Sequence, residues 1–299
     1  MSESRKGLIL AGGKATRLYP LTYSISKQLL PIYDKPMIYY PLSTLMLAGI
    51  KEFLIIVNPI HLTHFKNLLG NGSQWGISIK YAIQEKPEGL AQAFLIAEDF
   101  IKESPSVLIL GDNLFHGSEL VKKLEIANKK DSKSTIFVYP VRDPERYGVA
   151  EFNKNKKVIN IEEKPKNPRS RFAVTGIYFY DNTVCEKAKM INPSERGELE
   201  ITSINNLYLK NQSLEVEIMD RGMAWLDTGT FDSLHQASSY IRLLERRQGL
   251  KVGCPEEIAW RKQWITDTDL EELAKNIIKS GYGEYLLDIL NDPLNKKSQ

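Results

Sequence analysis

Short apolar runs that stop at glycine alternate with helix-like segments in the first half of the chain. The first run covers residues 7–11 and stops at Gly12 and Gly13, and a later one covers residues 107–110 and stops at Gly111. Apolar runs of this length, bounded by turn residues, are typical of strands buried on both faces. Their alternation with helices predicts right-handed crossovers and a mostly parallel sheet flanked by helices, and hence a layered, Rossmann-like α/β fold.

The elements expected in this half follow from the same pattern. Each apolar run is a strand, and each segment with apolar residues three and four apart is a helix. The expected strands are residues 7–11, 53–57, 77–81 and 107–110, and the expected helices are residues 41–48, 61–69 and 90–101. Ligands of such sheets bind beyond the carboxyl ends of the strands, so the functional site is expected there.

The pattern changes after residue 133. Strand-like segments now follow one another through turns, and the C-terminal part is mostly helical. Thr268 and Glu271 have the spacing of a capping box, which marks the start of a helix. The α/β core therefore carries an inserted β part and a helical C-terminal appendage. The expected strands are residues 134–141, 149–152, 158–163 and 174–180, and the expected helices are residues 233–248 and 267–279.

Composition excludes several classes of function. Of the 299 residues, 42% are hydrophobic and 26% are charged, which excludes a chain that is disordered throughout. A net charge of +3 is too small to indicate nucleic acid or a membrane as partner. Cys185 and Cys254 form no CxxC metal pair, and the apolar stretch after Lys6 is too short for a secretory leader or a membrane span. We therefore expect a cytoplasmic protein.

The loop after the first strand has the residues of a phosphate-binding loop. Gly12 and Gly13 let the backbone approach a ligand and direct N–H groups at phosphate oxygens. Arg17 adds a planar donor fork, and Lys14 and Lys27 add point charges. The loop is neither a Walker A loop nor G-x-G-x-x-G, which argues against a nicotinamide-dependent dehydrogenase. From these residues alone, a tight turn with solvated basic side chains remains an alternative.

The motifs that follow resemble those of the sugar-1-phosphate nucleotidyltransferases, and among them the short-form glucose-1-phosphate thymidylyltransferases. The matching segments run nearly from end to end of the chain and occur in one order. They include Lys27-Gln28-Leu29-Leu30-Pro31, Gly89-Leu90-Ala91-Gln92-Ala93, Gly111-Asp112-Asn113, Asp143-Pro144-Glu145-Arg146-Tyr147-Gly148-Val149, Glu162-Glu163-Lys164-Pro165, Gly197-Glu198-Leu199-Glu200-Ile201-Thr202 and Trp225-Leu226-Asp227-Thr228-Gly229.

This resemblance implies a reaction. An oxygen of α-D-glucose 1-phosphate attacks the α-phosphorus of dTTP, giving dTDP-glucose and pyrophosphate, as the first step toward deoxysugars such as dTDP-rhamnose. Two anions must be brought together, so cations and positioning supply most of the catalysis. The attacking phosphate is already ionised at neutral pH, so no general base is needed.

The same resemblance implies five catalytic residues and one cofactor. Arg17 and Lys27 would act on the triphosphate, and Lys164 would act on the sugar phosphate. Asp112 and Asp227 would hold Mg²⁺, which prefers oxygen ligands and takes few of them from protein. Apart from the resemblance, both aspartates could simply cap the turn or helix that follows them.

Further residues are implied as ligands of the substrates. Gln84 and Gly89 would read the thymine edge, Glu163 would bind glucose hydroxyls, and Trp225 would wall the sugar pocket. Each of these could instead serve loop geometry or packing. The implied nucleotide-binding residues are Leu10, Gly12, Gly13, Lys14, Thr16, Arg17, Lys27, Gln84, Pro87, Gly89 and Asp112, and the implied sugar-binding residues are Asn113, Tyr147, Gly148, Glu163, Lys164, Val174 and Trp225.

Two loops depart from the family pattern. Lys14 and Ala15 stand where these thymidylyltransferases have Ser-Gly, and residues 85–88 replace a more neutral run in the base-reading loop. Ala15 adopts a positive φ only at a cost, so the loop is either reshaped or compatible with a negative φ at that position. Both changes bear on the choice between dTTP and UTP.

The resemblance extends to organisation and regulation. Residues 1–250 would form the nucleotidyltransferase core, with a nucleotide-binding part over residues 1–133 and a sugar-binding part over 134–230. Residues 251–299 would form an appendage at subunit contacts of a homotetramer, with a second, regulatory nucleotide site. A plain helix start with a solvated arginine is the alternative to that site. Its implied residues are Gly117, Arg221, Cys254, Glu257, Ile258 and Arg261.

Two other functions remain open. The same chemistry with UTP or another sugar 1-phosphate is the nearer alternative, although Lys27-Gln28-Leu29-Leu30-Pro31 argues against the enzymes that make UDP-glucose. A nucleotide-sugar-binding regulatory module without activity is the more distant one. Such a module is expected to have lost a phosphate-binding cation or a metal carboxylate, and all five catalytic positions are filled here.

Overall fold

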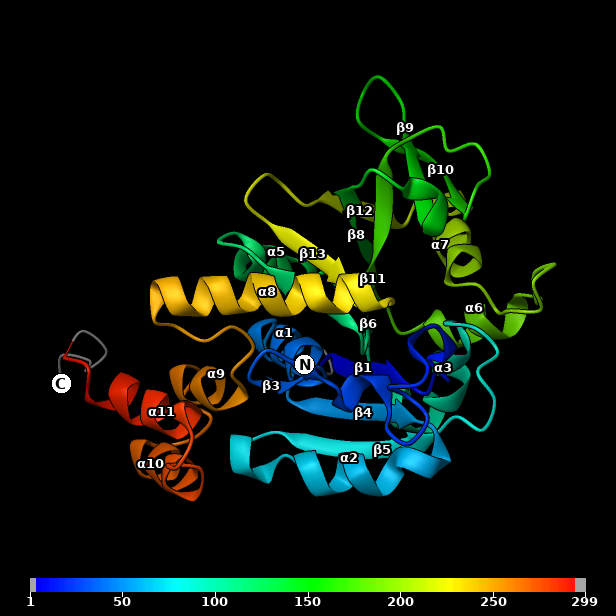
Figure 1. Ribbon diagram of the computed structural model, residues 1–299. Helices are drawn as coiled ribbons and strands as arrows, with labels where there is room; N and C mark the ends of the chain where they lie inside the picture. Colours follow the sequence, from blue (N-terminus) through cyan, green and yellow to red (C-terminus); the bar gives the residue numbers. More distant parts are fainter. Residues whose placement is uncertain (1–3, 294–299) are drawn as a thin grey trace.

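The apolar runs of the first half form neighbouring parallel strands inside a nine-stranded sheet (Figure 1). The computed structural model describes residues 4–293. The strand order is β10-β9-β11-β6-β1-β4-β5, and β8 pairs with β11 and β12. The strands are β1 Lys6–Ala11, β4 Glu52–Val57, β5 Ser78–Ile83, β6 Ser106–Leu110, β8 Ser134–Pro140, β9 Gly148–Phe152, β10 Val158–Glu163, β11 Phe172–Tyr180 and β12 Leu214–Ile218.

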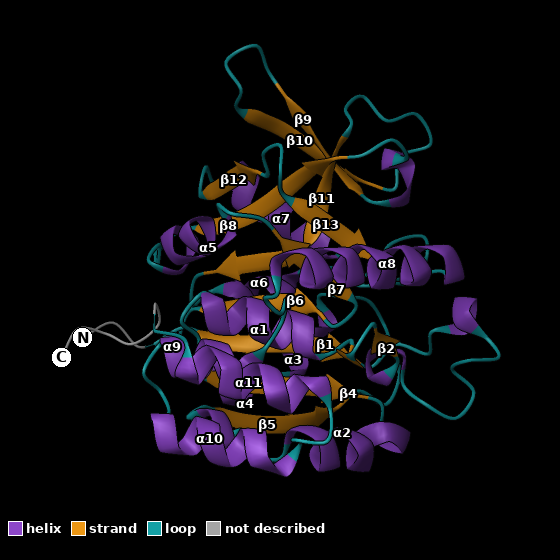
Figure 2. Ribbon diagram, turned by 60° about the vertical axis from the view of Figure 1, so that its left-hand side comes forward, coloured by secondary structure: helices purple, strands orange, loops and turns teal. Residues whose placement is uncertain are grey.

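Successive side chains of the central strands are buried on opposite faces of the sheet. Leu8 and Leu108 join one core with Phe94 and Ile204 of the helices on that face. Ile9 belongs to the other core, together with residues of α1, α2 and α5. Because both faces are covered, the strands read as continuous apolar runs rather than alternating ones. Helices lie on both sides of the sheet in Figure 2.

The other regular elements include α-helices and short strands outside the main sheet. Among the described residues, four short strands lie outside the main sheet, where β2 pairs with β3 and β7 pairs with β13. These strands are β2 Pro31–Ile32, β3 Lys35–Pro36, β7 Asn113–His116 and β13 Ala224–Asp227. The α-helices are α1 Tyr39–Leu47, α2 Leu62–Leu69, α3 Gln92–Ile96, α4 Glu98–Ile101, α5 Leu120–Asn128, α6 Val184–Met190, α7 Ile201–Lys210, α8 Phe231–Gln248, α9 Pro255–Arg261, α10 Asp267–Asn276 and α11 Gly281–Asn291.

The layered α/β fold expected from the sequence is confirmed, but two local expectations are wrong. The helix expected over residues 90–101 is divided at Ala97, whose φ and ψ are −91° and 3°. The capping box expected from Thr268 lies two residues earlier. The Thr266 hydroxyl accepts a hydrogen bond from the Asp269 backbone N–H, and the Asp269 carboxylate accepts one from the Thr266 N–H.

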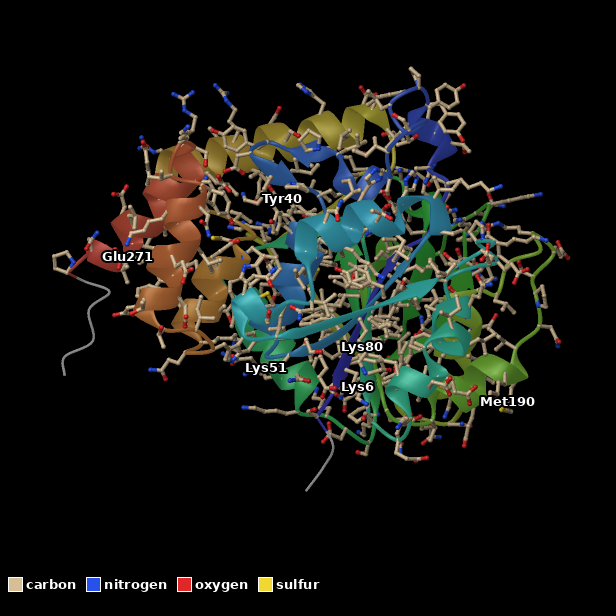
Figure 3. The ribbon with its side chains drawn as sticks, turned by 90° about the horizontal axis from the view of Figure 1, so that it is seen from below. Lys6, Tyr40, Lys51, Lys80, Met190 and Glu271 are labelled. Carbon is tan, nitrogen blue, oxygen red and sulfur yellow. The ribbon has the colours of Figure 1, made fainter. Side chains whose placement is uncertain are left out.

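The C-terminal helices pack against the first half of the chain. Helix α9 contacts α1, and α10 contacts both α9 and α11. Seen from below in Figure 3, Glu271 of α10 lies on one side of the molecule and Met190 at the end of α6 on the other. Among the described residues, no helix combines the length and the apolarity needed to cross a lipid bilayer.

Candidate active site

A cavity of about 650 Å³ opens beyond the carboxyl ends of β1, β5 and β6. Its walls come from both the parallel strands and the antiparallel strands β9 to β11. Fifteen of the residues expected from the sequence line this one cavity. They are Leu10, Gly13, Arg17, Gln84, Pro87, Gly89, Asp112, Asn113, Tyr147, Gly148, Glu163, Lys164, Val174, Trp225 and Asp227.

Four expected residues do not line the cavity directly. Gly12, Lys14 and Thr16 belong to the loop after β1, and Lys14 and Thr16 are exposed. Lys27 lies beneath the cavity wall with 6% of its surface exposed and reaches the site through Asp112.

The cavity also contains residues that the sequence reasoning missed. Some of them stand inside motifs already recognised, but without an assigned chemical role: Gln28, Leu90, Arg146 and the segment from Glu198 to Thr202. The others, Leu110, Gly176 and Tyr178, carry no distinctive local signal. The additional lining residues are Gln28, Leu90, Leu110, Arg146, Gly176, Tyr178, Glu198, Glu200, Ile201 and Thr202.

The glycine loop brings Arg17 to the carboxylates. Ala15 precedes a 3₁₀ turn over Thr16–Leu18 that carries Arg17 on its exposed side. A Cβ atom on Gly229 would lie 3.3 Å from Arg17 Nη2 and 3.5 Å from Asp227 Oδ2. The guanidinium and this carboxylate therefore both lie close to a backbone position that has no side chain.

At the position where Lys14 and Ala15 depart from the family pattern, the backbone of Ala15 is left-handed. Ala15 has φ 49° and ψ 39°, so the second of the two expected outcomes, a negative φ, is wrong. The Thr22 hydroxyl donates to the Ala15 carbonyl over 2.9 Å, and the Leu18 N–H donates to the same oxygen over 3.0 Å. These hydrogen bonds hold Ala15 in a left-handed conformation that costs an L-residue about 1–2 kcal/mol.

Asp112 is held ionised by a buried lysine. Lys27 Nζ lies 2.5 Å from Asp112 Oδ2, and the Asn113 amide donates to Asp112 Oδ1 over 2.8 Å. Burial alone would raise the pKa of the Asp112 carboxyl, but the Lys27 ammonium and these hydrogen bonds hold it below its ordinary value. This carboxylate is therefore available as an anionic oxygen ligand at neutral pH.

The antiparallel pairing of β7 with β13 brings Asp227 beside Asp112. Asn113 and Asp227 are directly paired across the two strands, and Asp112 immediately precedes Asn113. The backbone N–H and the hydroxyl of Thr228 both donate to the Asp112 carbonyl, over 3.1 and 2.9 Å. Residues more than a hundred positions apart thus place two carboxylates at one end of the cavity.

Arg146 contacts the second of these carboxylates. Its Nη2 lies 3.3 Å from Asp227 Oδ2, while its Nη1 donates to Asp143 Oδ2 over 2.6 Å. The guanidinium lies over the Tyr147 ring, 5.2 Å from its centroid. A half-exposed cation therefore borders the Asp227 side of the cavity.

The sugar-binding residues expected from the sequence surround the other part of the cavity. Trp225 Nε1 donates to Asn113 Oδ1 over 2.6 Å, and the Tyr147 and Trp225 rings meet edge to face at 5.0 Å. Both polar ends of the Asn113 side chain are thus occupied, so this residue positions Trp225 and Asp112.

Glu163 and Lys164 follow one another at the end of β10. The Thr202 hydroxyl donates to Glu163 Oε2 over 2.5 Å, and Lys164 Nζ lies 3.9 Å from Glu163 Oε1. Burial raises the pKa of the Glu163 carboxyl, opposed by the Thr202 hydrogen bond and reinforced by the nearby Glu200. The backbone N–H of Lys164 donates to the Tyr147 carbonyl, which joins this strand end to the aromatic wall.

The carboxylates fit a hard divalent cation. No group of three or more His, Cys, Asp or Glu side chains within residues 4–293 is arranged to hold a metal. Mg²⁺ needs only one or two protein carboxylates when substrate phosphates and water complete its octahedron. Asp112 and Asp227, one of them held ionised by its neighbours, match that donor set.

A second cavity, of about 410 Å³, lies between α1, β7 and the C-terminal helices. It is lined by Gly117, Cys254, Glu257, Ile258 and Arg261, five of the six residues expected for a regulatory site. The sixth, Arg221, is exposed and does not line it.

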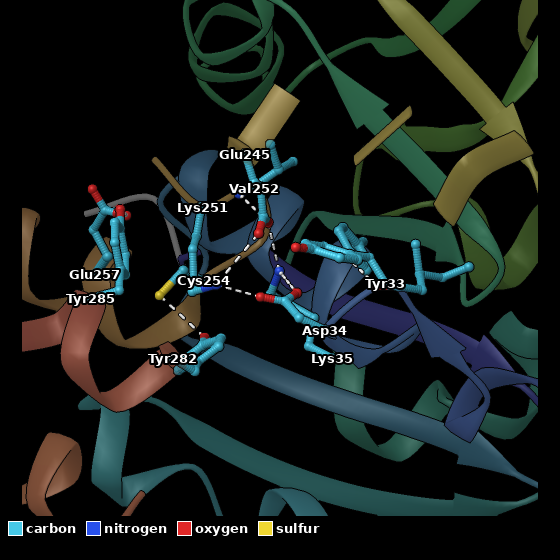
Figure 4. A network of polar contacts seen from close by, with 12 residues as sticks. Tyr33, Asp34, Lys35, Glu245, Lys251, Val252, Cys254, Glu257, Tyr282 and Tyr285 are labelled. Carbon is cyan, nitrogen blue, oxygen red and sulfur yellow. Dashed lines mark hydrogen bonds and ion pairs between the residues drawn. The ribbon is translucent and has the colours of Figure 1, made fainter. Parts of the chain in front are cut away.

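A buried ionic network borders this second cavity (Figure 4). Lys35 Nζ lies 2.6 Å from Asp34 and 2.8 Å from Glu245 of α8, and Lys251 also contacts both carboxylates. Tyr282 of α11 lies under both lysines, with ring centroids 5.8 and 5.0 Å from their ammonium groups. The network therefore connects the β2–β3 hairpin, α8 and the C-terminal helices.

Known proteins are similar to this chain in both sequence and fold. The family model described as nucleotidyl transferase matches residues 6–242. Because that match covers most of the chain, the protein belongs to the nucleotidyl transferase family.

Individual relatives carry a more specific name. A glucose-1-phosphate thymidylyltransferase of Neisseria meningitidis serogroup A is 55% identical, over 95% of this chain and 99% of the relative. One of Mycolicibacterium smegmatis with the same name is 54% identical, over 96% of this chain and 99% of the relative.

Solved structures agree with this likeness. A Bacillus anthracis protein provisionally named glucose-1-phosphate thymidylyltransferase, in complex with sucrose, is 44% identical with a TM-score of 0.74, covering 80% of this chain and 96% of that one. A UDP-glucose pyrophosphorylase complexed with UDP-glucose shares the fold, with a TM-score of 0.68 at 24% identity, covering 81% of this chain and 100% of that one.

Proposed function

We propose that this protein transfers a thymidylyl group from dTTP to α-D-glucose 1-phosphate, giving dTDP-glucose and pyrophosphate. The name of the relatives that are more than half identical supports this reaction. The observation that carries the proposal is one cavity lined by Arg17 and Lys164 around two adjacent carboxylates, with Lys27 against one of them.

The cations bind and orient the two anionic substrates. Arg17, beside Asp227 and Gly229, binds the triphosphate and stabilises the charge that moves onto pyrophosphate. Lys27 holds Asp112 and adds positive potential on the same side. Lys164, 42% exposed, binds the phosphate of the sugar and positions its oxygen for attack.

Mg²⁺ is the cofactor that we propose for this site, with Asp112 and Asp227 as its protein ligands. When bound, the ion neutralises phosphate charge and orients the α-phosphate. Asn113 keeps the Asp112 carboxylate in place, and Thr228 fixes the backbone of the same residue.

The sugar is held by the wall around Trp225. Tyr147 and Trp225 offer apolar ring surface to the hexose, and Glu163 accepts hydrogen bonds from its hydroxyls. The backbones of Gly148 in β9 and Val174 in β11, which line the same cavity, add further contacts.

The second cavity supports a further part of the proposal. A nucleotide-sugar end product binds among Gly117, Glu257 and Arg261 and lowers the activity, with subunits assembled as a homotetramer. Two free, buried cysteines and nucleotide substrates support a cytoplasmic location.

Replacing Lys164 tests the sugar-phosphate role. Lys164→Ala removes a charged hydrogen bond to the phosphate, so kcat/KM for glucose 1-phosphate is expected to fall about 10- to 100-fold. The KM for dTTP should change little. Lys166→Ala, an exposed lysine two residues later, is the matched control and should keep wild-type kinetics.

Steady-state rates with each substrate varied in turn make the measurement. An unchanged dependence on glucose 1-phosphate in Lys164→Ala would remove this residue from the site.

A further inference from the structure

Three side chains at the base-reading end of the cavity are joined by hydrogen bonds. Gln84 follows β5, Gln92 begins α3, and Glu88 lies in the loop between them. Gln84 Nε2 lies 2.6 Å from Gln92 Oε1, and Gln92 Nε2 lies 2.8 Å from Glu88 Oε2. The backbone N–H of Glu88 lies 3.1 Å from Gln92 Oε1.

The backbone N–H and the carboxylate of Glu88 determine the orientation of both amides. A backbone N–H can only donate, so the Gln92 atom facing the Glu88 N–H must be the oxygen. The amino group of Gln92 then faces the Glu88 carboxylate, which accepts when ionised. Gln84 must therefore present its own amino group to the Gln92 oxygen.

This orientation leaves the Gln84 oxygen for a ligand. Among residues 4–293, no hydrogen bond reaches Gln84 Oε1, although Gln84 is only 2% exposed and lines the cavity. The oxygen lies against Gly12, where a Cβ atom would approach it to 2.1 Å. Gly12 thus gives the amide room to lie flat along the loop after β1.

A fixed carbonyl oxygen selects among nucleobases by the proton at N3. Thymine carries an N3–H that donates to this oxygen, whereas N3 of cytosine is itself an acceptor and would be repelled. A site built around a buried polar group rejects a ligand that leaves the group unpaired.

We propose that Gln92 is a specificity-determining residue that acts through Gln84. It holds the Gln84 amide with its oxygen toward the base, and so favours a pyrimidine with a protonated N3. This inference rests on the proposed function, whose nucleotide binds beside Gln84.

The test measures kcat/KM for dTTP and for dCTP, with glucose 1-phosphate and Mg²⁺, in the full-length protein. Gln92→Leu frees the Gln84 amide to rotate, so the preference for dTTP is expected to fall at least about 10-fold. Damage to the fold alone would lower both rates together and leave the ratio unchanged.

Two controls keep the number of polar groups while changing their identity. Glu88→Gln retains an oxygen for the Gln92 amino group and should keep the preference for dTTP. The double variant Gln92→Glu with Glu88→Gln exchanges the two groups, so the new carboxylate still accepts from Gln84 Nε2 and the preference should again be retained.

Titration calorimetry with dTDP and dCDP provides a second readout. The role of Gln92 is overturned if Gln92→Leu keeps the preference for the thymine nucleotide, or if the double variant loses that preference as fully as Gln92→Leu does. It is also overturned if the wild-type protein binds dTDP and dCDP equally well. A wild type that prefers dTDP yet releases no pyrophosphate contradicts the proposed function, and the binding ratio of Gln92→Leu then decides on Gln92.

Discussion

Asp112 and Glu163 are carboxylates of the same cavity, but the pKa of Asp112 is lowered and that of Glu163 is raised. Both are desolvated, which raises the pKa of a carboxyl group. At Asp112, Lys27 and the hydrogen bonds outweigh this effect of burial. At Glu163 burial dominates, because the Thr202 hydrogen bond lowers the pKa by less and Glu200 raises it further. The first carboxylate suits a cation at any pH near neutral, and the second takes up a proton first as the solution becomes acidic.

Glu163 is expected to contribute an acid limb to the pH profile. Because its folded pKa is raised, protonation begins above the ordinary range of a glutamate and weakens Glu163 as the acceptor that we propose for sugar hydroxyls. The ratio of wild-type to Glu163→Gln kcat/KM for glucose 1-phosphate should therefore decrease as the pH falls, since the phosphate itself titrates equally in both. Glu162→Gln, the exposed neighbour, is the control. A ratio independent of pH would exclude this role.

The same shift has a consequence for stability. A carboxyl group whose folded pKa lies above its unfolded pKa stabilises the native state below the unfolded value, and this contribution is lost as the pH rises through the folded value. Glu163→Gln should thus raise Tm more at neutral pH than at acidic pH.

At the scale of elements, strands with continuous apolar runs were predictable, and short strands that pair with a distant segment were not. The sequence predicts β4 from residues 53–57 and β6 from residues 107–110, because burial on both faces requires apolar residues at every position. The pair β7 and β13 has no such run, since it depends on pairing between residues over a hundred positions apart. The same distinction applies to the residues of the site. Arg17 was predictable because it stands in a local motif, whereas the contact of Arg146 with Asp227 exists only in the folded chain.

The start of α10 shows how two plausible caps are distinguished. Thr266 and Thr268 are both exposed threonines followed three residues later by an acid, but only Thr266 makes the reciprocal bonds. Thr266→Ala is expected to lower the free energy of unfolding by about 1 kcal/mol, and Thr268→Ala by much less. Urea denaturation measures both, and equal losses would contradict the assignment of the cap.

At the scale of the whole molecule, α8 and the β2–β3 hairpin link the surroundings of the two cavities. Lys35 lies in the hairpin that follows Lys27, and its partner Glu245 lies near the end of α8, the helix that begins shortly after Asp227. Val252, beside the second cavity, donates its N–H to the same Glu245 carboxylate over 2.9 Å. A ligand in the second cavity therefore contacts elements that continue into the active site.

Arg261 offers a test of that second cavity. Arg261→Ala should leave kcat/KM without product unchanged but raise the concentration of dTDP-rhamnose needed for half inhibition at least about 10-fold, because a charged contact is lost. Arg246→Ala on the exposed side of α8 is the control. Inhibition equal to the wild type in Arg261→Ala would exclude a regulatory ligand bound through this residue.

The central claim is thymidylyl transfer at the carboxylate pair, and pyrophosphate release measures it directly. Purified protein is offered dTTP, UTP, CTP, ATP and GTP, each with several sugar 1-phosphates, with and without Mg²⁺. Release should be greatest with dTTP and glucose 1-phosphate and should cease on chelation. It should fall at least about 1000-fold in Asp112→Asn, since the metal supplies several kcal/mol, but not in the exposed Asp99→Asn.

A preference for UTP would keep the chemistry but contradict the nucleotide assignment. Release that persists after chelation or in Asp112→Asn would contradict the metal site, and no release with any pair would contradict the account as a whole.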